Sequence, residues 1–341
     1  MNKKLLIGII VAFVLAVIGS YYLITQKTEE KTTGTKETLP VSYAGKKILY
    51  VDSYHEGYEW SDGVTRGVES VLKNTGVELK IIRMDTKRND SEQFGKEAGL
   101  LAKSVIEDFK PDVVILSDDP AFKYLLMPHY KDASLPFVYC GINWDTSIYG
   151  TPYKNATGMV EVSLTSQLLS YLKGYSKGER VGFIAGNTTT DKKNAEYHQK
   201  LFNITFTKIY HVNTFDEWKA AFLSLQNETD LAILENKAGI TNWDDLEVEA
   251  FALENAKIPS GTFQSFMTNY TLIGMTKIPE EQGEWSAQTA LKILDGVSPE
   301  SIPEVTNKKS DLMLNLKIAK KLNIAFTPAM IRAAKNIIKE E

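Results

Sequence analysis

Aromatic and polar side chains crowd one short loop early in the chain. They follow the apolar run KILYV and comprise Ser53, Tyr54, His55, Tyr58 and Trp60. Rings of this kind stack on flat ligands or hold a cation against their faces, and the hydroxyl and imidazole groups donate and accept hydrogen bonds. The loop is therefore a candidate recognition surface. The alternative is that the rings only pack the loop against the helix that follows, since aromatic side chains more often pack than bind.

Sequence patterns typical of catalytic sites are missing. There is no G-x-G-x-x-G after a predicted strand, no Walker phosphate loop, no G-x-S-x-G turn and no H-E-x-x-H helix. The four histidines are scattered, and Cys140, the only cysteine, lies inside an apolar run. These features predict a protein that is not an enzyme and that holds no metal and no cofactor.

Composition and the first residues predict a body held outside the cytoplasm. The formal net charge is −4 with both signs mixed, so no basic field is present to bind nucleic acid. Lys3 and Lys4 precede the uncharged stretch Leu5 to Ile24, which has about the 20 residues that a membrane-spanning helix needs. We expect residues 1–25 to anchor the protein, with cleavage and secretion as the alternative. Residues 26–45, rich in Lys, Glu and Thr, are expected to form a flexible tether.

The elements that position the loop follow an alternating pattern. From Lys46 onward, apolar runs alternate with amphipathic segments, which predicts a doubly wound α/β fold. Expected strands cover residues 47–52, 78–84, 112–116 and 136–141, and a second, similar set of strands and helices begins with a strand at 158–162 and continues to residue 263. Open α/β sheets bind ligands beyond the carboxyl ends of their strands. The loop after residue 52 therefore belongs at a ligand-binding edge.

The elements after residue 271 are too few for a third lobe. We expect strands at residues 272–276 and 312–316, and helices at 280–294, 318–322 and 328–339. Their simplest role is to cross back and complete the two earlier sheets.

Five segments carry a resemblance to a known family. They are ILYVDSYHEGYEWSDGVTRGV at residues 48–68, LSDDPAFKYLL at 116–126, PFVYCGINW at 136–144, ALKILDGVSPESIPEV at 290–305 and LNLKIAKKLNIAFTPAMIRAAKNII at 314–338. In these segments the chain resembles the ABC_sub_bind family, the extracytoplasmic substrate-binding proteins of ABC transporters, which includes proteins associated with tryptophan or tyrosine uptake. The patterns SYHxGYxW and SDDxA also resemble sensor modules fused to bacterial histidine kinases and cyclic-dinucleotide enzymes.

The resemblance implies two Rossmann-like lobes of the type I periplasmic-binding fold, joined by three hinge strands and closing on a small molecule. One lobe would hold residues 46–146 and 272–300, and the other residues 147–271 and 301–341. Loops after the strands would line the cleft. To the first loop they add Asp118, Asp119, Asn143, Trp144, Glu161, Asn187, Thr188, Glu235, Asn236, Phe263 and Gln264.

This set of side chains offers rings, amides and carboxylates but few cations. A phosphate ester fits poorly, because paired guanidinium contacts are missing. An aromatic amino acid or a related amine fits better. Its ring could stack on Tyr54 or Trp144, its ammonium could meet Asp118 or Glu161, and asparagine side chains such as Asn143 could bind its carboxylate.

Two of the polar assignments have structural alternatives. Asp119 could instead cap a helix that begins at Pro120. Asn143 and Asn187 could instead form turns. Asp118 is the polar residue that we expect most directly to contact ligand.

Three classes of function are compatible with these observations. We predict a solute-binding protein that delivers a small ligand to an ABC permease. The alternative is a sensory subunit whose closed form is read by a separate kinase or chemoreceptor. The third class, an extracytoplasmic enzyme on a similar sheet, is the least favoured, because the sequence offers no nucleophile with an adjacent base.

Overall fold

The first strand explains how the recognition loop is positioned. The computed structural model describes residues 42–340. Strand β1 (Lys47–Asp52) is buried from its second residue onward and pairs in parallel with β2 (Glu78–Arg83) and β3 (Val113–Ser117). A nearly continuous apolar run suits a parallel strand that is covered on both faces. The loop that begins at Ser53 therefore leaves the carboxyl edge of this sheet.

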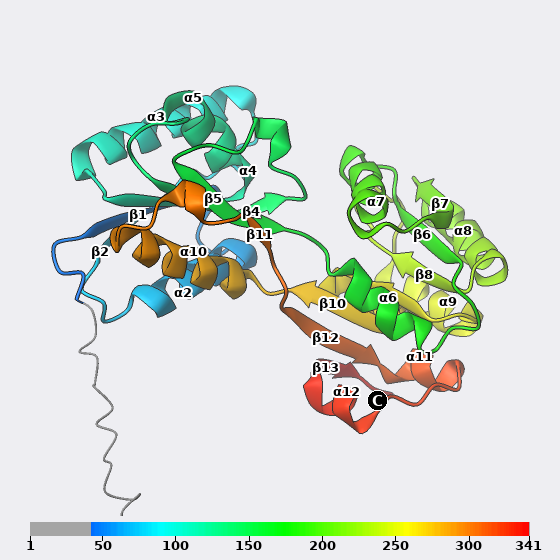
Figure 1. Cartoon of the computed structure of the whole chain (residues 1–341). Helices are drawn as coiled ribbons and strands as arrows, with labels where there is room; N and C mark the ends of the chain where they lie inside the picture. Colours follow the sequence, from blue (N-terminus) through cyan, green and yellow to red (C-terminus); the bar gives the residue numbers. More distant parts are fainter. Residues whose placement is uncertain (1–41, 341) are drawn as a thin grey trace, which may run out of the picture. The chain divides into compact units, whose positions relative to one another are not determined.

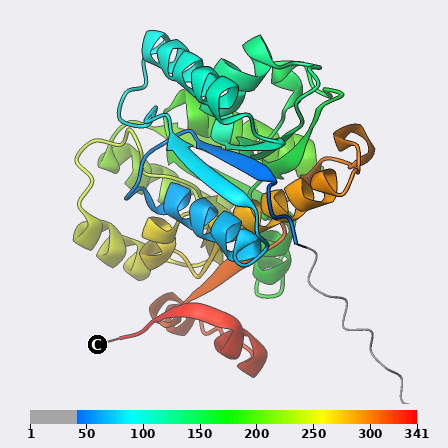
Figure 2. The same ribbon diagram turned by 90° about the vertical axis from the view of Figure 1, so that its left-hand side faces the viewer.

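This first sheet has six strands in the order β11-β5-β4-β3-β1-β2. The remaining members are β4 (Phe137–Asn143), β5 (Ala156–Glu161) and β11 (Val305–Thr306), and every pairing is parallel. Side chains of α2 (Glu59–Leu72) and α10 (Pro279–Leu294) form the core on one face. The other face is covered by α3 (Glu92–Phe109) and by the consecutive helical pieces α4 (Asp118–Ala121), η1 (Phe122–Leu126) and α5 (Met127–His129). Figure 2 shows α2 and α3 on opposite faces of β1.

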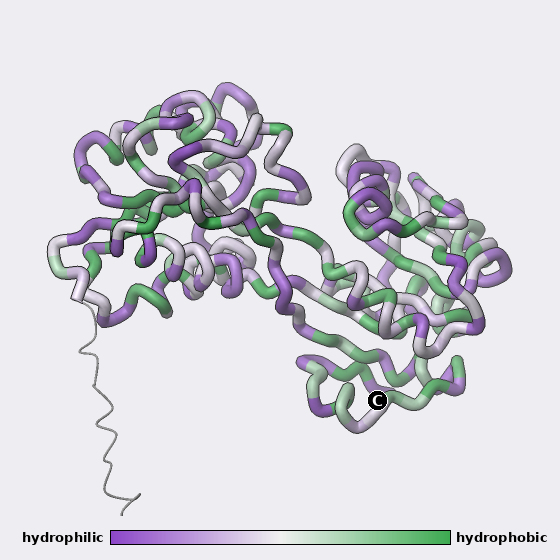
Figure 3. Tube along the Cα trace, in the orientation of Figure 1, coloured by the Kyte–Doolittle hydropathy of each residue, from purple (hydrophilic) through white to green (hydrophobic). Residues whose placement is uncertain are grey.

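A second sheet has seven strands in the order β13-β12-β10-β9-β8-β6-β7. They are β6 (Val181–Gly186), β7 (Phe206–Val212), β8 (Leu231–Leu234), β9 (Ser260–Thr262), β10 (Ile273–Lys277), β12 (Ser310–Asn315) and β13 (Ala334–Ile338). Only the pairing of β10 with β12 is antiparallel within this sheet of the described chain. Both sheets appear in Figure 1, and in Figure 3 hydrophobic stretches follow their strands.

Helices cover both faces of the second sheet as well. The core on one face includes side chains of α6 (Thr165–Lys173), α7 (Thr189–Phe202), α11 (Leu316–Lys321) and α12 (Pro328–Ala333). On the other face the core includes α8 (Phe215–Glu228), α9 (Asp245–Asn255) and η3 (Ser265–Tyr270). Two short turns belong to connections of the first sheet: η2 (Ser147–Tyr149) lies between β4 and β5, and η4 (Pro299–Ser301) lies between α10 and β11. The predicted doubly wound α/β class is confirmed.

The chain passes between the sheets after β5, after β10 and after β11. This order differs from two expectations. The strand expected at residues 158–162 in the second lobe pairs with β4 in the first sheet, and the strand expected at 272–276 in the first lobe pairs with β9 in the second sheet. A buried parallel strand has the same apolar pattern in either sheet, so its sequence did not indicate its neighbours.

The end of the described chain corrects a further expectation. The helix predicted over residues 328–339 ends at Ala333, and the strand β13 follows. Ile337 and Ile338 pair in parallel with Leu314 and Asn315 of β12. Two consecutive β-branched residues favour this extended pairing over another helical turn.

Side chains tie the crossing segments together. The Asn307 amide accepts from the Val162 N–H at 2.7 Å and donates to the Val162 carbonyl at 3.1 Å. The Glu281 carboxylate, near the start of α10, accepts from the backbone N–H groups of Lys308 and Lys309 at 2.9 and 2.7 Å. The third crossing is thereby bonded to the first and to the second.

The predicted anchor, residues 1–25, lies outside the described residues, as does most of the predicted tether, residues 26–45. Tyr43 already belongs to the body, because its N–H donates to the Thr75 carbonyl at 2.8 Å. Within residues 42–340, no helix combines the length and the apolar character that crossing a bilayer requires.

Candidate functional site

Ser53 fixes the recognition loop to the neighbouring strand. Its hydroxyl donates to the Ser117 carbonyl and accepts from the Ala121 N–H, the latter at 2.8 Å. The Thr86 hydroxyl donates to the Ser53 carbonyl at 2.7 Å. Ser53 is fully buried, so the structure assigns its hydroxyl to positioning the loop and the start of α4.

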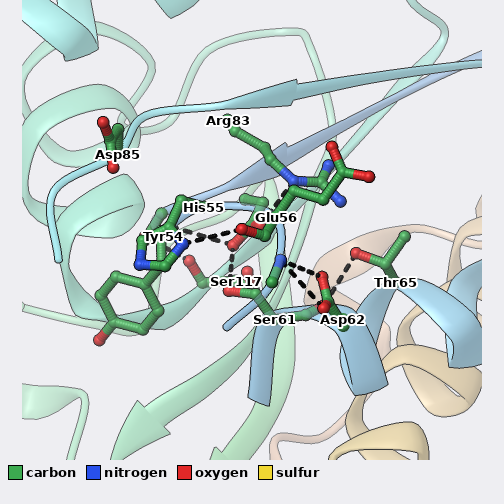
Figure 4. Close-up of polar contacts among 12 residues, drawn as sticks. Tyr54, His55, Glu56, Ser61, Asp62, Thr65, Arg83, Asp85 and Ser117 are labelled. Carbon is green, nitrogen blue, oxygen red and sulfur yellow. Dashed lines mark hydrogen bonds and ion pairs between the residues drawn. The ribbon is translucent and has the colours of Figure 1, made fainter. Parts of the chain in front are cut away.

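The rings of the loop gather beside one lysine. Tyr54 and Tyr58 meet edge to face with centroids 5.4 Å apart, and the Lys87 ammonium lies 5.0 and 5.1 Å from their centroids. His55 is a partly exposed neighbour, 5.8 Å from the Tyr58 ring, and its Nδ1 contacts the Glu56 carbonyl. Figure 4 shows the loop, in which Asp62 turns back to accept from the backbone. Burial, and then the charges of nearby carboxylates, raise the pKa of Tyr54 well above its usual value.

A cavity of about 440 Å³ adjoins this loop. Tyr54 and Asp119 line it together with Lys87, Lys123 and Tyr124 from neighbouring segments. Two of the predicted site residues therefore border an open space large enough for a small organic molecule.

Asp118 is one of the two most buried acidic groups of the predicted set, together with Glu235. It is the first residue of α4, has a left-handed backbone with φ of 68°, and is 1% exposed. Its Oδ1 accepts from Trp60 Nε1 at 2.9 Å. Its Oδ2 has no hydrogen-bond partner among residues 42–340. An unfilled buried carboxylate oxygen costs free energy until a donor reaches it.

The backbone approaches Asp118 closely at Gly141, which has φ of 70°. A Cβ at Gly141 would lie 3.0 Å from Asp118 Oδ1. Burial raises the pKa of Asp118 well above its usual range, and the negative charges of Glu161 and Asp52 raise it further. Burial favours the neutral carboxyl, whereas the negative charges of Glu161 and Asp52 favour the arrival of a positive charge.

Glu161 forms an ion pair that joins the two sheets. It is the last residue of β5 and is 7% exposed, and its Oε1 contacts the ammonium of Lys277, the last residue of β10. The Lys277 ammonium also lies 5.9 Å from the Trp60 ring centroid. We call Trp60, Asp118, Glu161 and Lys277 the carboxylate cluster.

Lys277 was not among the residues predicted from sequence. It ends an apolar strand, as Glu161 does, and this position was the signal that could have identified it. The sequence argument looked for rings and acidic groups after each strand, and it placed β10 in the wrong sheet.

Asp119 does not cap a helix, so that alternative was wrong. No side chain caps α4. Instead, Asp119 Oδ2 accepts from the backbone N–H and the Nδ2 of Asn143, both at 3.2 Å, and Oδ1 accepts from the Tyr149 hydroxyl at 2.6 Å. Asp119 and Asn143 therefore brace the loops that follow β3 and β4.

Trp144 connects the first sheet to a helix of the second. Its N–H donates to the Glu161 carbonyl at 3.0 Å, and its φ of 66° turns the chain out of β4. The indole stacks on Tyr197 with centroids 5.8 Å apart, and Nε1 donates to Asn194 Oδ1 at 2.9 Å. Both partners belong to α7.

The contacts continue from Asn194 into the second sheet. Asn194 Nδ2 donates to Glu235 Oε1 at 3.3 Å, and the other Glu235 oxygen lies 3.5 Å from His198 Nε2. The His198 ring stacks on Phe263 at 5.1 Å and meets the Trp144 edge at 5.0 Å. We call Trp144, Asn194, His198, Glu235 and Phe263 the Trp144 cluster. Asn194 and His198 lie inside a helix, so the search for polar and aromatic residues after each strand did not identify them.

The remaining predicted residues lie elsewhere. Asn187 is exposed, and its Nδ2 donates to Asn213 Oδ1 at 3.0 Å. Thr188 caps α7, and Asn236 donates to Asp191 at 3.2 Å. Gln264 donates through its backbone N–H to the Thr262 hydroxyl at 3.1 Å.

The carboxylate cluster is suited to binding a cation. It contains two carboxylates and one ammonium, beside an indole face. No group of three or more potential metal ligands occurs within the part of the chain that the structure describes. An organic cation with an apolar body matches these side chains.

Comparison with known proteins identifies the class. The sequence model of the ABC transporter substrate binding protein family matches residues 59–338, and the chain belongs to this family. Proteins of this family bind solutes outside the cytoplasm. No curated protein sequence matches the chain.

Solved structures share the fold at low sequence identity. A substrate-binding protein with adhesive properties from Clostridium difficile, in a ligand-free, open structure, has a TM-score of 0.65 and 17% identity over 86% of this chain and 100% of that one. An ABC domain in complex with L-Trp from Streptococcus pneumonia has a TM-score of 0.52 and 16% identity over 86% and 99% of the two chains. A periplasmic ribose ABC transporter from Conexibacter woesei has a TM-score of 0.52 and 15% identity over 86% and 99%. The fold is that of the type I periplasmic-binding proteins.

Proposed function

We propose that this solute-binding protein captures an aromatic amino acid or a related amine and delivers it to an ABC permease. The observation that carries the proposal is Asp118, a buried carboxylate with one unfilled oxygen that accepts from the Trp60 indole with its other oxygen. An ammonium would fill that oxygen, and an aromatic ring would pack against the neighbouring rings. The L-Trp complex of the Streptococcus protein supports the same ligand class.

We further propose that the two sheets act as lobes that close on the ligand. The first lobe would contain residues 43–162 and 278–307, and the second residues 163–277 and 308–340, with boundaries at the three crossings. Ligand contacts to both lobes would favour the closed form, which the permease would recognise. The protein would work by closure alone, without catalysis.

The apolar segment Leu5 to Ile24 would keep this body at the membrane on the outer side. Membrane fractionation of the full-length chain tests the tether. Recovery in the soluble extracellular fraction would instead indicate cleavage and secretion.

A thermal-shift series on the full-length chain tests the ligand class. L-tryptophan, L-tyrosine and tryptamine are compared with ribose, because a ligand that binds only the folded state raises the melting temperature. We expect the aromatic compounds to raise it and ribose to leave it unchanged. A rise with ribose and none with the aromatic compounds would contradict the proposed ligand.

A further inference from the structure

Lys277 and Glu161 form an ion pair at the point where the chain crosses between the sheets. Lys277 ends β10 of the second sheet, and Glu161 ends β5 of the first. The Lys277 side chain is 22% exposed and that of Glu161 is 8% exposed, so the lysine is the more exposed partner of the pair. The pair adjoins Trp60, which in turn donates to Asp118.

We propose that Lys277 determines specificity by binding the ligand's carboxylate, through an exchange of ion pairs. A bound α-amino acid replaces the internal pair, because its carboxylate takes the Lys277 ammonium while its own ammonium takes Glu161 and the unfilled oxygen of Asp118. This assignment rests on the proposed function.

The charges of the carboxylate cluster favour a zwitterionic amino acid over a ligand that carries only an ammonium or only a carboxylate. An amine without a carboxylate would satisfy Glu161 but leave Lys277 without its counter-ion. An acid without an amine would satisfy Lys277 but leave Glu161 unpaired. Removing one partner from a poorly solvated ion pair carries a large free-energy cost. A ligand with both charges can place its ammonium on both carboxylates while Lys277 stays paired, whereas a simple amine reaches both carboxylates only by leaving Lys277 unpaired.

The position of the pair links this exchange to the crossing segments. Val162 follows Glu161 directly and is bonded on both sides by the Asn307 amide. Ile278 follows Lys277 and precedes α10, in which Glu281 holds the backbone of Lys308 and Lys309. Ligand contacts at Glu161 and Lys277 therefore act directly beside the bonded crossings.

Binding measurements with three related probes test the proposal. The full-length wild type, Lys277→Met and Lys277→Arg are titrated by calorimetry with L-tryptophan, tryptamine and indole-3-propionate. Lys309→Met is the matched control, because Lys309 also lies at a crossing and pairs with Glu284 at 2.9 Å on the surface. Circular dichroism confirms that each variant is folded.

We expect the wild type to bind L-tryptophan at least about tenfold more tightly than either single-charge probe, the scale of one charge-assisted hydrogen bond. Lys277→Met should lose about 10- to 100-fold in L-tryptophan affinity while binding tryptamine at least as well as the wild type. Lys277→Arg should retain most of the L-tryptophan affinity. Lys309→Met should match the wild type for all three probes.

Different failures separate the two proposals. If the wild type binds L-tryptophan and Lys277→Met binds it equally well, the exchange is overturned while the proposed function stands. An equal loss of L-tryptophan and tryptamine affinity in Lys277→Met, or a loss in Lys277→Arg as large as in Lys277→Met, also overturns the exchange. If the wild type binds none of the three probes, the proposed ligand class is overturned and the role of Lys277 with it.

Discussion

The carboxylate cluster and the Trp144 cluster both contain buried polar atoms without a hydrogen-bond partner, yet the surroundings of these atoms differ. In the carboxylate cluster, Asp118 has an unfilled oxygen and the Lys277 side chain is partly exposed. In the Trp144 cluster, Glu235 Oε2 and His198 Nε2 also have no hydrogen-bond partner among residues 42–340, but these two atoms lie 3.5 Å from each other. The indole is stacked on one face and bonded at Nε1, and none of the three side chains belongs to a residue more than 7% exposed. This difference supports our proposal that the first cluster receives a ligand, whereas the second cluster joins the two sheets.

The largest expected effect is loss of stability from Trp144→Ala. The substitution removes the stacking on Tyr197, the edge contact with His198 and the hydrogen bond to Asn194. We expect the free energy of unfolding to fall by about 3–5 kcal/mol, as for other buried tryptophans. Urea unfolding followed by circular dichroism measures it.

Trp144→Phe is the matched variant, since it keeps a ring and loses the N–H donor. We expect its free energy of unfolding to fall by about 1 kcal/mol for the lost hydrogen bond, and by a little more because the smaller ring packs less well. A fall below about 1 kcal/mol for Trp144→Ala would show that this cluster does not hold the sheets together.

The second expected effect concerns binding in the other cluster. Asp118→Ala should weaken L-tryptophan binding by about 100-fold, or about 2.7 kcal/mol, because the ligand ammonium loses a charged acceptor. Calorimetric titration measures the affinity. Asp216→Ala is the control, because Asp216 is an exposed carboxylate paired with Lys219. Equal affinity in Asp118→Ala and wild type would place the ammonium site elsewhere.

A third effect depends on pH. The raised pKa of Asp118 means that the folded protein holds this proton more tightly than the unfolded chain does. Stability is therefore lost as pH rises from the unfolded pKa, about 4, toward the raised folded value. Asp118→Asn cannot ionise, so it should be more stable than wild type at pH 7, by about 1.4 kcal/mol for each unit of upward shift.

Thermal melting of both proteins at pH 4 and pH 7 tests whether Asp118→Asn gains stability relative to wild type as the pH rises. The advantage of Asp118→Asn should nearly disappear at about pH 4, where the folded wild type holds this proton and the carboxyl of the unfolded chain is about half protonated. A variant that is less stable than wild type at pH 7 would show that the ionised carboxylate is already well satisfied without ligand.

The smallest expected effect is that of Asn187→Ala. Within residues 42–340, its side-chain amide bonds only to Asn213, at the protein surface. We expect L-tryptophan affinity within about twofold of wild type and stability within about 0.5 kcal/mol. A tenfold loss of affinity in the same titration would extend the site beyond both clusters.

Position after a strand located some residues of the two clusters and missed others. The rule located Asp118 and Glu161, because parallel strands deliver their following residues to one edge. Asn194 and His198 were missed, since they lie in α7 and reach Trp144 only through tertiary packing. Lys277 required knowledge of which sheet holds β10, and that depends on pairings between distant segments.

The fold was predictable in its class but less so in its connections. Alternating apolar runs indicated both sheets, and Ser91 caps α3 as its sequence suggests. Nothing in the local sequence indicated that β5 belongs to the first sheet and β10 to the second. The strand β13 was predicted as part of a helix because its sequence pattern also suits a helix. Pairing partners, rather than strand locations, were the missing information.

Hydrogen exchange of the full-length chain, with and without L-tryptophan, tests the central claim most directly. Ligand bound between the two sheets at the carboxylate cluster should slow exchange in residues 52–62, 117–122, 161–165 and 277–281 together. Slowed exchange confined to one sheet, or none in these four segments under saturating ligand, would contradict the account.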